Sequence, residues 1–81
     1  MKNIRVKEIP EDVDQKLKEI GKRVRSYRKN KSSNYEDFAK KYNFNKVSLA
    51  RIETGKNYTV SSLIQLLKLL DVTLATLTKD L

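Results

Sequence analysis

Residues 34–55 read NYEDFAKKYNFNKVSLARIETG, and their order of polar and apolar positions predicts two short helices joined by a tight turn. Asn34 and Asn45 suit the position before a helix, because an amide oxygen accepts hydrogen bonds from free backbone N–H groups. Asn43 tolerates the left-handed conformation that ends a helix. The first helix is therefore expected to end near Asn43, and the second to run to about Thr54.

Three further helices are expected outside this stretch. Residues 11–29 place apolar side chains at helical spacing, and Gly21 allows a close approach there. Thr59 and Thr73 can cap two later helices, the first of which ends near Asp71. The expected inward residues are Val13, Leu17, Ile20, Val24, Tyr27, Val60, Leu63, Ile64, Leu67 and Leu70. The chain is therefore predicted to be all-α, with five helices.

The first ten residues differ from the rest of the chain. Ile4 and Val6 belong to an alternation of apolar and polar residues that suits a short strand or an extended arm. Pro10 then fits the first turn of a helix. We expect residues 1–10 to form an arm, strand-like or disordered, ahead of a single domain over residues 11–81.

Composition argues against several classes of protein. The 81-residue chain has neither cysteine nor histidine, so disulfides, thiolate metal sites and the usual nucleophile–base pairs are excluded. No apolar run approaches the roughly 18–20 residues of a membrane span, and no signal-peptide pattern opens the chain. We therefore expect a cytoplasmic protein that is not an enzyme and that binds no metal, cofactor or membrane.

Positive charge is concentrated in the middle of the chain, which carries a formal net charge of +8. Residues 15–56 hold 13 basic and four acidic residues, whereas the two flanking segments are nearly neutral. A basic region of this kind is typical of proteins that bind nucleic acid, although a solubilising surface is the alternative. The cluster taken as general electrostatic attraction rather than specific contact is Lys22, Arg23, Arg25, Lys29 and Lys31.

Two short helices that meet through a turn of roughly three or four residues form the helix-turn-helix unit. Its first helix rests across the phosphate backbone of DNA, and its second places its N-terminal half in the major groove. Residues 34–54 fit this geometry, with Leu49 and Ile52 holding the second helix on the core. The residues left on the outer face of that helix are Lys46, Val47, Ala50 and Arg51.

The stretch FAKKYNFNKVSLARIETGK, residues 38–56, resembles the phage-repressor and Cro-like helix-turn-helix family, often called the XRE family. The resemblance covers about residues 20–74. The positions that carry it are Ala39, Asn43, Phe44, Asn45, Leu49, Ile52, Glu53 and Gly55. It implies a lambda-repressor-like fold and sequence-specific binding of double-stranded DNA.

The resemblance also implies roles for individual residues. Arg28 and Glu53 would form an ion pair that ties the first helix to the end of the third. Lys46, Val47 and Arg51 fall on positions that read base edges. The positions implied to hold the DNA backbone are Asn34, Tyr35, Ser48, Lys56 and Asn57.

The chain departs from the family pattern in three places. Tyr35 stands where a glutamine that grips a phosphate is common, and the tyrosine hydroxyl has a different reach. Asn43 and Asp71 replace glycines, and both residue types tolerate the left-handed region at a small cost. The loop after Gly55 is shorter than usual and lacks the common proline, so its phosphate contacts need not follow the family.

Leucine is more abundant near the C-terminal end than one helical face requires. The candidates for a dimer interface are Leu66, Leu69, Leu74, Leu77 and Leu81, and the alternative is a thick core against the first helix. The expected function is that of a dimeric transcriptional regulator, a repressor rather than an activator. One alternative is an antitoxin that binds its own promoter and a toxin protein. Another is a protein-interaction module that uses the leucine-rich face.

Overall fold

The computed structural model describes residues 10–81, and within that range the chain forms five helices and no strand. The helices are α1 (Glu11–Lys31), α2 (Tyr35–Lys41), α3 (Lys46–Glu53), α4 (Val60–Leu70) and α5 (Leu74–Leu77). The predicted all-α fold with five helices is confirmed. Apart from Pro10, the predicted N-terminal arm lies outside the described residues.

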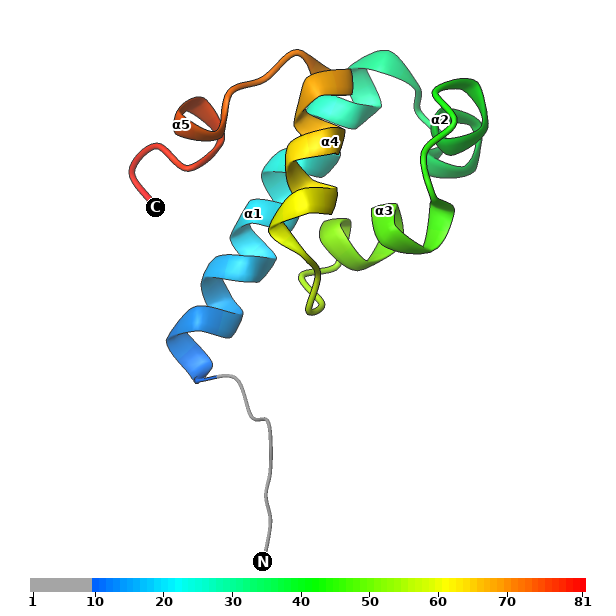
Figure 1. Cartoon of the computed structure of the whole chain (residues 1–81). Coiled ribbons are helices and arrows are strands. Elements are labelled where there is room, and N and C mark those ends of the chain that lie inside the picture. The colour runs from blue at the N-terminus through cyan, green and yellow to red at the C-terminus, as the bar shows by residue number, and fades with distance from the viewer. Residues whose placement is uncertain (1–9) are drawn as a thin grey trace, which may run out of the picture.

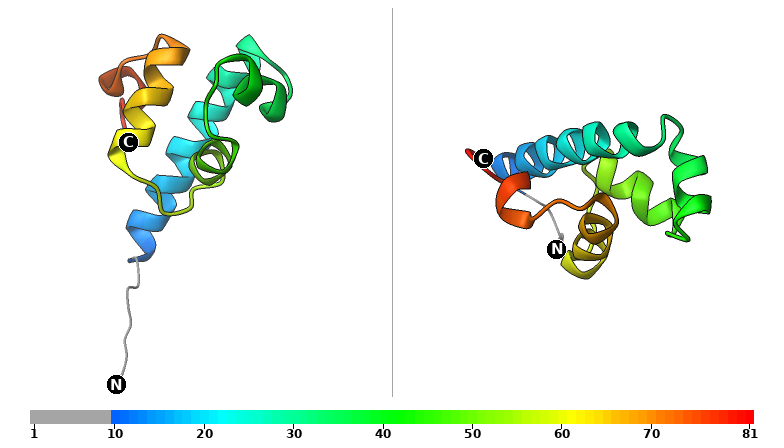
Figure 2. Two further views of the ribbon diagram at one scale, coloured as in Figure 1. Left: turned by 45° about the vertical axis from the view of Figure 1, so that its right-hand side comes forward. Right: turned by 90° about the horizontal axis from the view of Figure 1, so that it is seen from above.

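The long helix α1 is the spine of the molecule, because it packs against each of the other four helices. Helix α2 lies beside the C-terminal end of α1, α3 meets α1 near its middle at Gly21, and α5 lies on the side away from α2 (Figures 1 and 2). Helices α3 and α4 also contact each other. None of the described helices combines the length and the apolar character needed to cross a bilayer.

Side-chain caps begin four of the helices, as predicted. In each, the capping oxygen accepts a hydrogen bond from the N–H of the second or third helical residue, at 2.8 to 3.3 Å. The capping residues are Asn34, Asn45, Thr59 and Thr73. Asn43 and Asp71 adopt the expected left-handed conformation, with φ of 54° and 60°. Local sequence therefore sets where these helices begin and where the chain turns.

All five helices contribute buried side chains to the core, which corrects part of the predicted pattern. Leu66 and Leu77, expected at a dimer interface, are completely buried within the domain. Val60 and Ile64, expected inside, are exposed by 69% and 37%. The buried face of α4 includes Leu66 beside the predicted Leu63, Leu67 and Leu70, and Leu77 of α5 belongs to the same core. The remaining exception is Val13, which is exposed near the start of α1.

Gly21 lies where the backbone of α1 meets the end of α3. A Cβ atom built on this glycine would lie 2.5 Å from the carbonyl oxygen of Ile52 and 2.7 Å from that of Glu53. Real Cβ atoms do not approach backbone oxygens so closely, so only glycine fits. The predicted close approach at Gly21 is confirmed, and it brings α3 directly onto the spine.

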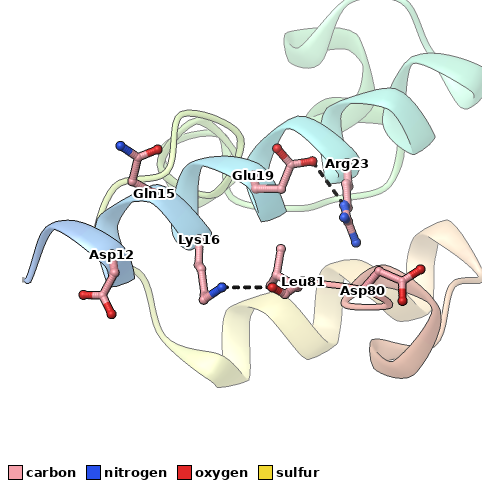
Figure 3. A pocket seen from close by; sticks show the side chains of 7 residues that line it. All are labelled: Asp12, Gln15, Lys16, Glu19, Arg23, Asp80 and Leu81. Atoms are coloured by element: carbon pink, nitrogen blue, oxygen red, sulfur yellow. Dashed lines mark hydrogen bonds and ion pairs between the residues drawn. The ribbon is translucent and has the colours of Figure 1, made fainter.

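Polar contacts attach the segment after α5 to the outer side of α1. The Nη1 atom of Arg23 donates to the carbonyl oxygens of Leu77 and Lys79, each at 2.8 Å. Lys16 Nζ donates to the carbonyl oxygen of Leu81 at 2.9 Å (Figure 3). These bonds return the C-terminal segment to α1 and so hold α5 in place over the core.

Candidate nucleic-acid interface

Helices α2 and α3 are joined by a tight turn with buried apolar support. Tyr42 ends α2, Asn43 takes the left-handed conformation, and the N–H of Phe44 donates to the carbonyl oxygen of Ala39 at 2.9 Å. Ala39 is buried, and Phe44 packs against the core from the turn. A small residue at position 39 and a left-handed residue at position 43 therefore permit the helix-turn-helix geometry that the sequence predicts.

Arg28 and Glu53 form a buried ion pair behind this unit. The Nε and Nη2 atoms of Arg28 each donate to one carboxylate oxygen of Glu53 at 2.8 Å, and Nη1 donates to the carbonyl oxygens of Ser32 and Ser33 at 3.0 Å. The hydrogen bonds to Glu53 raise the pKa of Arg28 above its ordinary value, against the opposing effect of burial. One side chain thus joins α1, the loop before α2 and the end of α3.

The outer face of α3 carries the three residues proposed to read bases. Val47 is 59% exposed, and Lys46 and Arg51 are also exposed. Val47 and Arg51 are four residues apart, so they lie on one side of the helix. Leu49 and Ile52, on the opposite side, are completely buried. The core therefore fixes which face of α3 is presented to solvent.

An acidic residue that the sequence pattern does not indicate lies beside this face. Glu36 Oε2 is 3.4 Å from Lys46 Nζ, and both side chains are more than half exposed. The contact joins the first turn of α2 to the first residue of α3. The spacing of residues within one helix cannot predict such a pair, because only the angle between α2 and α3 brings the two residues together.

The residues proposed to hold the DNA backbone surround α2 and α3, and several of their polar groups are already in use. The Oδ1 atom of Asn34 caps α2, which leaves its amide N–H groups as donors. The backbone N–H of Lys56 donates to the carbonyl oxygen of Arg51 at 2.8 Å, so only the Lys56 side chain can bind a phosphate. Tyr35 and Asn57 are exposed, and Ser48 is half-buried.

Comparison with known proteins identifies this region. A family model described as "Helix-turn-helix" matches residues 24–77, about two thirds of the chain. The match begins in α1 and ends in α5, so it includes α2, α3 and both partners of the buried ion pair. No curated protein and no solved structure matches the chain.

Proposed function

The chain belongs to the XRE-like helix-turn-helix family of sequence-specific DNA-binding regulators, and from that premise we propose that it is a dimeric transcriptional repressor. The observation that carries the proposal is the outer face of α3. It presents exposed Lys46, Val47 and Arg51 from a helix whose opposite side is locked into the core. A rigid, exposed and cationic helix face is what major-groove reading requires.

Each of the three residues has a chemical role in this proposal. The Arg51 guanidinium matches the O6 and N7 acceptors of a guanine, and the Val47 methyl groups match a thymine methyl. Lys46 reaches a guanine or a phosphate once it leaves Glu36, since their exposed pairing is weak. The preference for particular base pairs would therefore depend mainly on Arg51 and Val47, and Lys46 would contribute to it secondarily.

Contacts to the DNA backbone would set the position of α3 in the groove. The Asn34 amide and the Lys56 ammonium offer donors to phosphate oxygens, and Asn57 and the Ser48 hydroxyl offer further ones. Tyr35 would contribute through its phenolic hydroxyl. These contacts carry no sequence information, but they fix the register in which Arg51 and Val47 meet the bases.

The dimer in this proposal would use the exposed apolar residues of α4 and the segment beyond it. Leu74 is 43% exposed and Leu69 and Leu81 are half-buried, so these three candidates remain after Leu66 and Leu77 are removed. Val60 and Ile64 add exposed apolar surface on α4. A two-fold pairing through this surface would present two copies of α3 to one duplex.

Selection of binding sites from random duplex DNA tests the function directly. We expect an enriched site with two symmetric half-sites spaced by about one helical turn, roughly 10 base pairs. Sedimentation of the free protein and of its complex would give the stoichiometry. Enrichment of no sequence would contradict specific binding, and a single half-site bound by one chain would contradict the dimer.

A further inference from the structure

A recess of about 290 Å³ lies between α1, the start of α2 and the C-terminal half of α3. It is lined by Arg25, Arg28, Tyr35, Ala50, Glu53 and Thr54. Its volume corresponds to roughly ten water molecules, which is enough for a phosphodiester group. Because Ala50 and Glu53 belong to α3, the recess lies directly beside the helix that carries Arg51.

The charges around this recess leave one net positive charge. Glu53 would repel an anion, but both of its carboxylate oxygens accept hydrogen bonds from Arg28 at 2.8 Å. The buried pair is therefore neutral as a unit. Arg25 is exposed, and it forms no ion pair with any other residue in the range 10–81. Its guanidinium supplies the charge that an anion in the recess would meet.

Two hydrogen-bond donors in the lining remain available. The Thr54 hydroxyl is engaged, because it donates to the carbonyl oxygen of Ala50 at 2.7 Å. The Tyr35 side chain is exposed, and its hydroxyl is absent from the side-chain hydrogen bonds of residues 10–81. Arg25 contributes the guanidinium N–H groups. A planar guanidinium and a phenolic hydroxyl on one small recess match the oxygens of a phosphate group.

We propose that Arg25 and Tyr35 together bind one phosphate of the DNA backbone in this recess. The inference rests on the proposed function, since the phosphate belongs to the strand that borders the groove entered by α3. Arg25 then has a specific contact, in contrast to the general attraction expected of its basic cluster. The pair also gives the tyrosine at position 35 a cationic partner for the phosphate, since both residues line the same recess.

The test uses the selected duplex with single phosphates replaced, one at a time, by neutral methylphosphonates. At one position per half-site, we expect the replacement to weaken wild-type binding about ten-fold, which is the size of a charge-assisted hydrogen bond. Arg25→Gln should weaken binding to the unmodified duplex by a similar factor. At that one phosphate, the methylphosphonate should cost Arg25→Gln almost no further affinity, because the contact is already lost. In Tyr35→Phe the methylphosphonate should cost less affinity than in the wild type. At every other phosphate, both variants should lose as much affinity as the wild type does.

Lys22→Gln is the matched control, because Lys22 is an exposed basic residue of α1 that does not line the recess. The loss of affinity caused by Lys22→Gln should add to the loss caused by a methylphosphonate at every position of the duplex. Thermal unfolding of Arg25→Gln should match that of the wild type, since the Arg25 side chain forms no hydrogen bond or ion pair with the residues of the range 10–81. Specific binding with no phosphate coupled to Arg25 would overturn this inference and leave the proposed function intact. Failure of the wild type to select any duplex would overturn both.

Discussion

Two arginines of α1, five residues apart in sequence, hold opposite sides of the molecule at very different degrees of burial. Arg28 holds the α2–α3 side, and its side chain is 3% exposed and paired with a carboxylate. Arg23 holds the end of α5 and the segment after it. Its side chain is 28% exposed, donates to two backbone carbonyl oxygens and pairs with Glu19 of its own helix at 3.3 Å. The side proposed to meet DNA is therefore fixed by a buried charge pair, and the other side by solvated polar contacts over a leucine core.

The two sides also differ in how completely their buried polar groups are satisfied. On the α2–α3 side, Arg28 makes four hydrogen bonds, two of them to Glu53. On the α4 side, the buried Oη atom of Tyr58 has no hydrogen-bond partner among the described residues. A satisfied network specifies one geometry, whereas an unsatisfied hydroxyl costs stability without specifying any. Orientation is therefore fixed more strictly on the side of α3.

Breaking the buried pair is expected to have the largest effect. Arg28→Met leaves the Glu53 carboxylate buried without a partner, which typically costs about 3–5 kcal/mol of unfolding free energy. Arg23→Met is the matched change on the solvated side, and it should cost about 1 kcal/mol. Urea unfolding followed by circular dichroism measures both. Equal losses in the two variants would refute the contrast between the two sides.

The next largest loss of unfolding free energy is expected when one methyl group is added at Gly21. Gly21→Ala places Cβ against the backbone oxygens of Ile52 and Glu53, which cannot rotate away, so α3 must shift from α1. We expect a loss of about 1–3 kcal/mol by overpacking, although alanine is the better helix former by about 1 kcal/mol. Ser26→Ala, at an exposed position of α1, isolates the propensity gain. A stabilised Gly21→Ala would contradict the close contact.

The predictions from sequence succeed where the cause is local. A capping oxygen acts on amides two or three residues away, and a left-handed residue acts on its own turn, so Asn34, Asn45 and Asn43 are placed correctly. The close approach at Gly21 is also predicted correctly, because a glycine inside a helix costs stability that close packing can offset.

The predictions fail where the cause is tertiary. Helix α4 has leucines on several sides, so its sequence permits more than one apolar stripe, and packing in the folded domain buries the one that includes Leu66. The inward positions predicted for Val60 and Ile64 are therefore wrong.

The sequence does not indicate Glu36 and Arg25 as site residues for the same reason. Their neighbours Lys46 and Tyr35 come from other parts of the chain. Only the packing of α1, α2 and α3 brings each pair together, and a sequence pattern within one helix cannot predict that packing.

The two sides should also differ when exposed basic residues are removed. Arg51→Ala should weaken binding to the selected duplex by about 1–3 kcal/mol and relax the preference at one base position. Lys68→Ala, an exposed change on α4, should alter binding by less than about 0.5 kcal/mol. Fluorescence anisotropy with selected and scrambled duplexes measures both. An equal loss for Arg51→Ala on both duplexes would show a phosphate contact and not a base contact.

The smallest effect is expected at Tyr58, where removing the unsatisfied hydroxyl should stabilise the domain. Tyr58→Phe should raise the unfolding free energy by up to about 1 kcal/mol at neutral pH.

Burial also raises the pKa of Tyr58 above its ordinary value near 10. Only the unfolded chain then ionises readily, so wild-type stability is kept below pH 10 and lost as the pH rises through that value. The advantage of Tyr58→Phe should therefore widen at alkaline pH. Tyr42→Phe, whose ring packs on Phe38, is the matched control, and the same trend in both variants would mean that the Tyr58 hydroxyl is not shielded from solvent.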